Sequence, residues 1–314
     1  MHAYSLTAPA KINLYLEIIG DRPDGYHELA MILQSIDLAD QIHLRANGTD
    51  EIRIHCDDPH VPADESNLAY RAAALMMRQF PETYHRFGGV DIAIEKHIPM
   101  GAGLAGGSTD AAAVLVGIDL MWNLGLTQIE IQELAAKLGS DIPFCVAGGT
   151  AIATGRGERL SPLPCPEGIH VVLAKYRGLA VSTPWAYKTY RQQFQSSYAP
   201  DSETLLDRRR RVHSGPMVEA IAKRDLHRIG TLLHNDLERV VLPAHPLITQ
   251  LREELAQLET LGVMMSGSGS TVFALVDSQA TAEMVKQQLQ DRLPDPDLGV
   301  WTTQFIANGI QLIH

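Results

Sequence analysis

The chain has 314 residues, of which 45% are hydrophobic, and its formal net charge at pH 7 is −11. This length exceeds what a single core usually supports and the apolar fraction is enough for two, so we expect two domains, over 1–160 and 161–314. The acidic balance argues against nucleic acid as a partner, because binding that polymer depends on clustered Lys and Arg.

Neither a membrane anchor nor an export signal is visible. The longest apolar run, 111–118, is far shorter than the roughly 18–20 residues of a membrane span. The N-terminus shows no charged leader with an apolar core and a cleavage site. Cys56, Cys145 and Cys165 are widely spaced and odd in number, which favours a reducing compartment. Cys145 is expected to be a buried filler. We expect a cytoplasmic protein with no membrane contact.

The first 80 residues alternate as strands do and then change to a helical pattern. Strands are predicted over 4–8, 12–19, 32–36, 41–45 and 51–55. A turn that contains Asp24-Gly25 follows the second strand. Residues 64–80 are predicted to form a helix that begins near Ser66 or Asn67.

Residues 99–110 are the most informative stretch, because they join a strand to a helix through four glycines. Val90, Ile92 and Ile94 alternate with more polar residues before this stretch, and 111–122 is helix-forming after it. Glycine lets backbone N–H groups approach a ligand closely, and the first helical turn adds unpaired donors and partial positive charge. The stretch therefore predicts a cradle for phosphate.

Other interpretations of this loop remain open. Glycine-rich loops between strand and helix are common, and this one lacks both the Walker pattern and the dinucleotide-binding spacing. The hydroxyl of Ser108 or Thr109 is suited either to a metal ion or to capping the helix. Asp110 suits the helix dipole but would repel phosphate, so we expect it to turn away and support the fold.

The remaining elements suggest an α+β protein. Thr127 and Glu130 form a capping box for a helix over 131–138. A change of domain is expected near 158–166, followed by strands over 171–174 and 264–276 and a helix over 279–293. The basic run 208–211 lies in a polar stretch and is predicted to be a solvated loop or an exposed helix. Strand-rich ends with helices on one face favour α+β over a doubly wound sheet.

Four motifs in order resemble the GHMP kinases, a superfamily that includes galactokinase, homoserine kinase and mevalonate kinase. The loop 99–110 resembles the superfamily's ATP-binding loop, and its Gly-Gly-Ser-Thr-Asp form is most similar to the branch that acts on 4-diphosphocytidyl-2-C-methyl-D-erythritol in the non-mevalonate isoprenoid pathway. Ser140 is a small departure, because the family has Ala there. The other motifs are Pro9-Ala10-Lys11-Ile12-Asn13-Leu14 with the following Pro23-Asp24-Gly25-Tyr26-His27, then Gly139-Ser140-Asp141-Ile142-Pro143-Phe144, and lastly Ser266-Gly267-Ser268-Gly269, which resembles the third family motif.

The resemblance covers essentially the whole chain and implies a fold and an activity. It implies an N-terminal, ATP-binding domain of the ribosomal-S5-domain-2 type and a C-terminal, ferredoxin-like domain, with the active site in the cleft between them. It implies ATP-dependent phosphorylation of the 2-hydroxyl of the diphosphocytidyl substrate, with Mg²⁺ as cofactor. We expect a monomer or a weak homodimer.

The resemblance also implies roles for single residues. Lys11 and Asp141 match the catalytic pair, and Ser108 is the candidate metal ligand. Asn13, Tyr26, His27 and Tyr187 match the substrate side. The predicted nucleotide site consists of Asn67, Lys96, Pro99, Met100, Gly101, Ala102, Gly103, Leu104, Ala105, Gly106, Gly107, Ser108 and Thr109.

Spacing alone supports plainer alternatives for several of these residues. Asp141 precedes Ile-Pro and reads equally as a helix N-cap. Lys11 reads as an exposed strand end and His27 as a surface residue of a turn, and Trp185 competes with Tyr187 if that segment is extended. Two rival functions remain, another GHMP kinase of homoserine or mevalonate type, and a non-catalytic regulator that binds ATP and sugar. Fold alone does not separate them.

Overall fold

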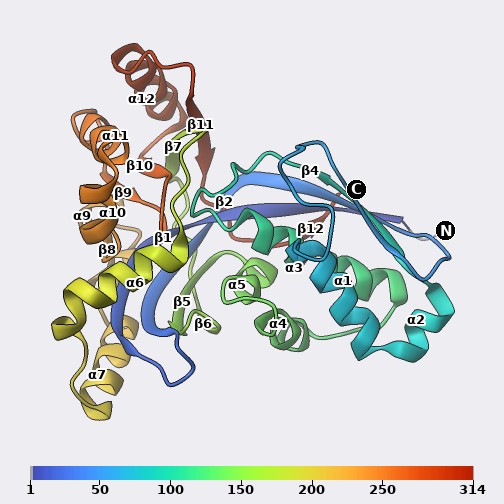
Figure 1. Cartoon of the computed structure of the whole chain (residues 1–314). Coiled ribbons are helices and arrows are strands. Elements are labelled where there is room, and N and C mark those ends of the chain that lie inside the picture. Colours follow the sequence, from blue (N-terminus) through green and yellow to red (C-terminus); the bar gives the residue numbers. More distant parts are fainter. Residues whose placement is uncertain (1–2, 314) are drawn as a thin grey trace.

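Two sheets organise the computed structural model, which describes residues 3–313 (Figure 1). The larger sheet has the strand order β12-β1-β2-β4-β3, with β5 and β6 continuing from β2 and β8 pairing with β1. Its long strands β1 and β2 form an antiparallel hairpin whose tip is 22–26. The bounds are β1 Ala3–Asp21, β2 His27–Ala46, β3 Ile52–Cys56, β4 Val90–Glu95, β5 Thr150–Gly155, β6 Arg159–Leu163, β8 His234–Asn235 and β12 Gln311–Leu312.

The smaller sheet has the order β11-β7-β10-β9, and all of its strand pairs are antiparallel. Its strands, with α12 between the third and fourth, give the 4-1-3-2 order of a ferredoxin-like domain, so the predicted α+β class is confirmed. The bounds are β7 His170–Tyr176, β9 Gly262–Met265, β10 Val272–Val276 and β11 Leu298–Gln304.

The helices form separate groups at the two ends of the molecule (Figure 1). Those of the first half cover the larger sheet, and α11 and α12 pack on the smaller one. The bounds are α1 Leu68–Gln79, α2 Pro81–Phe87, α3 Gly106–Trp122, α4 Gln128–Ala136, α5 Ile142–Ala147, α6 Thr183–Phe194, α7 Ser202–His213, α8 Pro216–Lys223, α9 Leu226–Thr231, α10 Glu238–Ala244, α11 Pro246–Ala256 and α12 Gln279–Arg292.

Apolar side chains buried between the two sheets join them. Ile12 and Leu14 of β1 lie in the same buried cluster as Leu173 of β7 and Phe273 of β10. Burial of such side chains stabilises each by about 1.5–3 kcal/mol relative to exposure. Because β8 and β12 return to the larger sheet, the two halves of the chain are interleaved, and the domain division at residue 160 stays a prediction.

Several predicted elements are longer than expected. The predicted strands 4–8 and 12–19 form the single strand β1, because the pairing with β2 shifts register between Pro9 and Ala10 and continues. Such a bulge absorbs the irregularity without ending the strand. The predicted start of α1 at Asn67 is confirmed, since its side chain accepts a hydrogen bond from the Ala69 N–H, and the capping box at Thr127 is confirmed.

The central helix α3 begins five residues earlier than predicted. Its cap is Ala105, whose φ of 60° is left-handed and whose side chain makes no capping bond. The alternative that Ser108 or Thr109 caps the helix is therefore wrong, because both lie inside the first turns. The residues 106–108 thus offer their unpaired N–H groups as part of the loop, as a helix N-terminus does. Among residues 3–313, no helix is long and apolar enough to cross a membrane.

Candidate active site

A cavity of about 960 Å³ lies between the two halves of the chain. The glycine loop and α1 line it from the first half, and α6 and the loop 267–269 line it from the second. All but one of the predicted site residues line this cavity: Lys11, Asn13, Tyr26, His27, Asn67, Lys96, Pro99 to Ser108, Asp141 and Tyr187. Thr109 is the exception, because it is fully buried on the inner side of α3.

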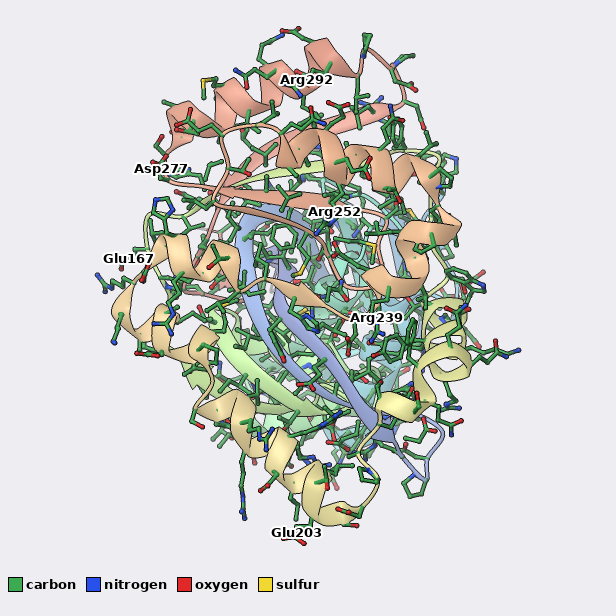
Figure 2. All side chains as sticks on the ribbon, turned by 90° about the vertical axis from the view of Figure 1, so that its left-hand side faces the viewer. Glu167, Glu203, Arg239, Arg252, Asp277 and Arg292 are labelled. Atoms are coloured by element: carbon green, nitrogen blue, oxygen red, sulfur yellow. The ribbon has the colours of Figure 1, made fainter. Side chains whose placement is uncertain are left out.

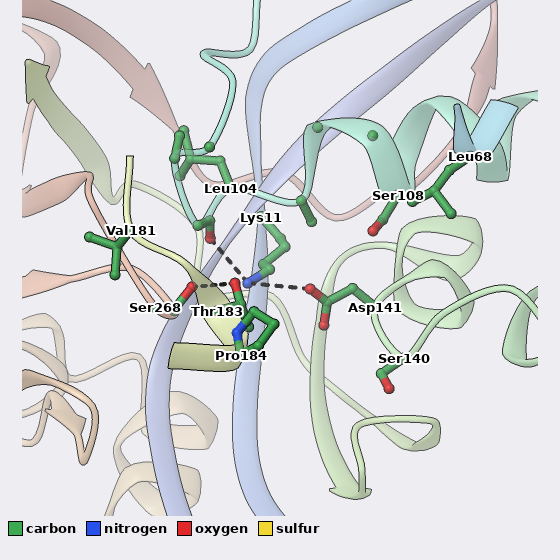
Figure 3. Close-up of a pocket in the computed structure, with 18 of the residues that line it drawn as sticks. Lys11, Leu68, Leu104, Ser108, Ser140, Asp141, Val181, Thr183, Pro184 and Ser268 are labelled. Atoms are coloured by element: carbon green, nitrogen blue, oxygen red, sulfur yellow. Dashed lines mark hydrogen bonds and ion pairs between the residues drawn. The ribbon is translucent and has the colours of Figure 1, made fainter. Parts of the chain in front are cut away.

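The ammonium group of Lys11 lies at the centre of the site (Figure 3). It donates hydrogen bonds to Asn13 Oδ1 at 2.8 Å and to the Gly103 carbonyl at 3.1 Å. Its third neighbour is Asp141 Oδ2 at 3.8 Å. Lys11 is only 4% exposed, so the alternative of an exposed strand end is wrong. Three acceptors hold this charge against the cost of burying it.

The side chain of Asp141 faces the cavity from the start of α5 (Figure 3). Asp141 has the position of a helix N-cap, yet its carboxylate makes no capping bond. The carboxylate is 36% exposed and has Lys11 as its ion-pair partner. A carboxylate that faces the cavity beside a buried ammonium is placed to accept a proton from a bound hydroxyl.

The glycine loop packs against the third motif, the loop 266–269 of the second half of the chain. Gly103 has a left-handed φ of 73°, and a Cβ atom there would lie 2.1 Å from the Ser266 carbonyl oxygen. The Ser266 hydroxyl donates back to the Gly103 carbonyl at 3.0 Å. Only glycine allows this approach of two backbones. The contact fixes the loop of the first half against a loop of the second.

Asn235, which belongs to none of the sequence motifs, stabilises the loop 266–269. The Asn235 amide donates to the carbonyls of Met265 and Gly267, each at 2.8 Å. On the cavity side, the hydroxyls of Thr183 and Ser268 lie 2.7 Å apart (Figure 3). Sequence reasoning missed Asn235 because no local pattern marks a buried amide in a two-residue strand.

Lys96 lines the cavity, but its ammonium group is held by protein carboxylates. It donates to Asp110 Oδ2 at 2.7 Å and to Asp40 Oδ2, and all three side chains are buried. Asp40 also accepts the N–H groups of His97 and Ile98, at 2.6 and 2.8 Å. Asp110 is buried and paired with Lys96, as expected of a residue that supports the fold, but it lines the cavity and does not turn away from it. Burial raises the pKa of its carboxyl group. No local sequence pattern marks Asp40, which lies in the second half of β2.

The opposite end of the cavity is aromatic. The rings of His27 and Tyr187 lie 5.0 Å apart and tilted by 33°, and Tyr26 is half exposed with the Arg156 guanidinium 5.1 Å from its ring centre. Tyr187 faces the cavity from α6, whereas Trp185 packs edge-on against His245, so the two residues do not share a face. The segment is a helix, which is why the extended alternative is wrong.

His27 is buried, and one of its ring nitrogens has no hydrogen-bond partner among residues 3–313. Its Nε2 atom has no hydrogen-bond partner in residues 3–313 and lies 3.7 Å from Asp21 Oδ1. Burial, and then the Arg191 guanidinium, lower the pKa of His27 below its ordinary value, against the opposing Asp21 carboxylate. The ring is therefore neutral at pH 7 and lines the cavity, and it carries a buried polar atom that the protein leaves unpaired. The alternative of a surface histidine is wrong.

Known proteins resemble this chain over its full length. Residues 67–149 match the family described as GHMP kinases N terminal domain, and residues 217–295 match GHMP kinases C terminal. The 4-diphosphocytidyl-2-C-methyl-D-erythritol kinase of Nostoc punctiforme is 64% identical, with 99% of each chain covered, and that of Trichodesmium erythraeum is 60% identical, with 100% of each covered.

Solved structures agree with this similarity. A crystal structure of 4-(cytidine 5'-diphospho)-2C-methyl-D-erythritol kinase superposes with a TM-score of 0.72 at 31% identity, covering 96% of this chain and 98% of that one. A homoserine kinase from Cytophaga hutchinsonii has a TM-score of 0.77 at 19% identity, covering 100% and 98%, and shows the shared fold alone. The chain belongs to the 4-diphosphocytidyl-2-C-methyl-D-erythritol kinase family of the GHMP kinases.

Proposed function

We propose that this chain transfers the γ-phosphoryl group of ATP to the 2-hydroxyl of 4-diphosphocytidyl-2-C-methyl-D-erythritol. The observation that carries the proposal is one cavity with a catalytic pair, Lys11 and Asp141, beside the glycine loop and an unpaired buried His27 at its other end. The named relatives support the same substrate.

The glycine loop and the first turn of α3 bind the phosphates of ATP in this proposal. Phosphoryl transfer depends on holding the phosphates and the attacking hydroxyl in line while charge is neutralised. Backbone N–H groups at the start of α3 supply donors, and the Lys11 ammonium supplies positive charge. Lys96 acts indirectly, because its two carboxylate partners occupy its ammonium group and fix the strand end before the loop.

Asp141 accepts or orients the proton of the 2-hydroxyl. Its carboxylate is open to the cavity and forms an ion pair with Lys11. Positioned proton-transfer groups contribute about 10²–10⁴ in rate. In this proposal, the Lys11 ammonium stabilises the negative charge of the phosphoryl group during its transfer.

The cytosine base binds at the aromatic end. His27 Nε2 provides a polar atom for the edge of the base, and Tyr187 provides an aromatic surface 5.0 Å from the His27 ring. Asn13 lies beside Lys11, 1% exposed, and orients that ammonium group.

Mg²⁺ fits the first turn of α3, where Ser108 lines the cavity with its hydroxyl. Within residues 3–313, no group of three His, Cys, Asp or Glu side chains is arranged to hold a metal ion. Mg²⁺ usually binds through one or two protein ligands, with substrate phosphates and waters completing its shell, and it neutralises phosphate charge.

We also propose a cytoplasmic location and a monomer or weak homodimer.

A panel of acceptors tests the proposed function against its rivals. Coupled ADP release is measured with the diphosphocytidyl substrate, methylerythritol phosphate, mevalonate and homoserine in parallel. We expect turnover with the diphosphocytidyl substrate alone. Preferred turnover of mevalonate or homoserine would favour another GHMP kinase, and no turnover of any acceptor with intact ATP binding would favour a regulator.

Asp141→Asn tests the catalytic pair. We expect kcat to fall by about 10²–10⁴, because the amide accepts no proton, while ATP still binds to the untouched loop. Steady-state kinetics and calorimetric titration with ATP measure the two effects. A variant that keeps more than about a third of wild-type turnover contradicts the role, since positioned proton transfer contributes far more than this.

Gly107→Val tests the phosphate cradle. A Cβ atom at Gly107 meets only Leu68 Cδ1 at 3.9 Å, so the fold accepts it, whereas the rest of the side chain enters the cavity. We expect ATP binding to weaken by about tenfold or more, equivalent to roughly 1.4 kcal/mol. Calorimetry measures the affinity, and an unchanged melting temperature confirms the fold. Unchanged ATP affinity in the folded variant would make the loop purely structural.

His27→Ala tests the base-binding end. Removing the ring leaves polar groups of the base unpaired in a partly buried site, which costs about 1–3 kcal/mol. We expect KM for the diphosphocytidyl substrate to rise about 5- to 150-fold at 25 °C with little change in KM for ATP. His227→Ala, an exposed histidine of α9, is the matched control. A rise in KM for ATP alone would show that the two pockets are reversed.

A further inference from the structure

The basic run of α7 contains one arginine that differs from its neighbours. Arg210 and Arg211 are exposed, and Arg208 donates to the Ser197 carbonyl at 2.8 Å. Arg209 instead turns toward the β1–β2 hairpin and donates to Glu28 Oε1 at 2.5 Å. Figure 2 shows α7, with Glu203 at its outer side, at the lower end of the molecule, opposite α12 with Arg292. The run lies on a helix in which Arg210 and Arg211 are exposed as expected, whereas Arg208 and Arg209 are half-buried.

Glu28 is a buried carboxylate that accepts hydrogen bonds from three residues. It is 2% exposed. Its Oε1 atom accepts from both Arg209 and the Gly155 N–H, the latter at 3.0 Å, and its Oε2 atom accepts from Arg22 at 2.8 Å. A buried carboxylate persists only with such partners, so Glu28 joins β2, β5, α7 and the hairpin tip at one point.

The contacts continue from Glu28 into the hairpin tip. Arg22 also donates to Asp24 Oδ2 at 3.2 Å, and Asp24 Oδ1 accepts the N–H of Tyr26 at 3.1 Å. The Arg22 N–H donates to the Tyr26 carbonyl at 2.9 Å. A chain of polar contacts therefore runs from Arg209 of α7 to the backbone of Tyr26, next to His27.

Strand geometry puts this cluster behind the cavity. Neighbouring residues of a strand point to opposite faces, so the His27 ring faces the cavity while the Glu28 carboxylate faces α7. Neither Glu28 nor Arg209 lines the cavity, so neither touches a ligand there. Their effect on a ligand must pass through the hairpin.

A second helix holds the same hairpin from the cavity side. Arg191 of α6 donates to Asp21 Oδ1 at 2.8 Å and to the Gly25 carbonyl at 3.4 Å. The connection from α6 to α7 adds the Tyr198 ring, edge-on to His27 at 6.2 Å, and the Ala199 N–H, which donates to the Ile19 carbonyl at 2.8 Å. In Figure 1 both helices lie beside the hairpin at the lower left.

We propose that the ion pair between buried Glu28 and half-buried Arg209 is a positioning device that holds the 22–27 tip, and with it Tyr26 and His27, in the conformation that receives the acceptor substrate. The proposal rests on the proposed function in one respect, that this end of the cavity binds the acceptor and not ATP. The glycine loop belongs to a different part of the first half, so loss of the pair leaves the ATP side unchanged.

Arg209→Ala is the test, with Arg210→Ala as the matched control from the exposed face of the same helix. We expect Arg209→Ala to raise KM for the diphosphocytidyl substrate by about 2- to 30-fold, the usual range for residues that act on a site through others. KM for ATP and kcat at saturating substrates are expected to stay within about twofold of wild type. Arg209→Lys keeps the charge without the planar fork, so it should restore part of the loss.

Glu28→Gln covers the case in which Arg209→Ala does not fold, because it preserves shape and removes the charge. The same selective rise in acceptor KM is expected, and the double variant should add little to either single one. An unchanged acceptor KM in folded Arg209→Ala and Glu28→Gln, an equal rise in Arg210→Ala, or a parallel loss in kcat and both KM values would overturn the proposal. If the wild-type protein fails to phosphorylate the diphosphocytidyl acceptor, the proposed function itself fails, and the inference with it.

Discussion

The ammonium group of Lys11 is the contact on which the site depends. It comes from β1, donates hydrogen bonds to the Gly103 carbonyl and to Asn13 Oδ1, and faces Asp141 at 3.8 Å. A buried ammonium is costly unless each of its protons has an acceptor, so the requirement fixes the glycine loop and α5 relative to β1. The Gly103 carbonyl is shared with the Ser266 hydroxyl, so the second half of the chain is tied to the same point. The Gly103 carbonyl therefore both stabilises the buried Lys11 ammonium and links the two halves of the chain.

Two further buried lysines show how surroundings separate structural from catalytic roles. Lys96 has two fully buried carboxylate partners, and Lys175 donates to the carbonyls of Tyr176 and Arg177. Burial lowers the pKa of Lys175, whereas the Asp110 and Asp40 carboxylates outweigh burial and raise the pKa of Lys96. Lys11 alone of these three has a partly exposed carboxylate as its ion-pair partner, which leaves both groups accessible to a bound phosphate and hydroxyl.

Local signals in the sequence identified most of the site, and long-range pairs account for what they missed. Asn67, Thr127 and the glycine loop carry their signals within a few residues, so their positions were predictable. The start of α3 was not, because the cap is Ala105, whose side chain offers no polar group. The sequence predicts Thr109 in the nucleotide site. Because α3 already begins at Gly106, the side chain of Thr109 is instead buried in the core. Asp40, Asn235 and Arg209 act on partners far away in sequence, and no spacing pattern marks such pairs.

The proposed acceptor end of the cavity is held by more of the chain than the proposed ATP end. The glycine loop is a short segment stabilised by one helix and two nearby contacts, and the homoserine kinase with 19% identity has the same overall fold. The hairpin tip, by contrast, is held by α6 through Arg191 and by α7 through Arg209, with Tyr198 closing the gap between them. Substrate choice within one fold requires such adjustable supports, because the phosphate chemistry is common and the acceptor is not. A polar chain behind the His27–Tyr26 tip lets residues outside the cavity set the shape of the base pocket while Lys11 and Asp141 remain in place.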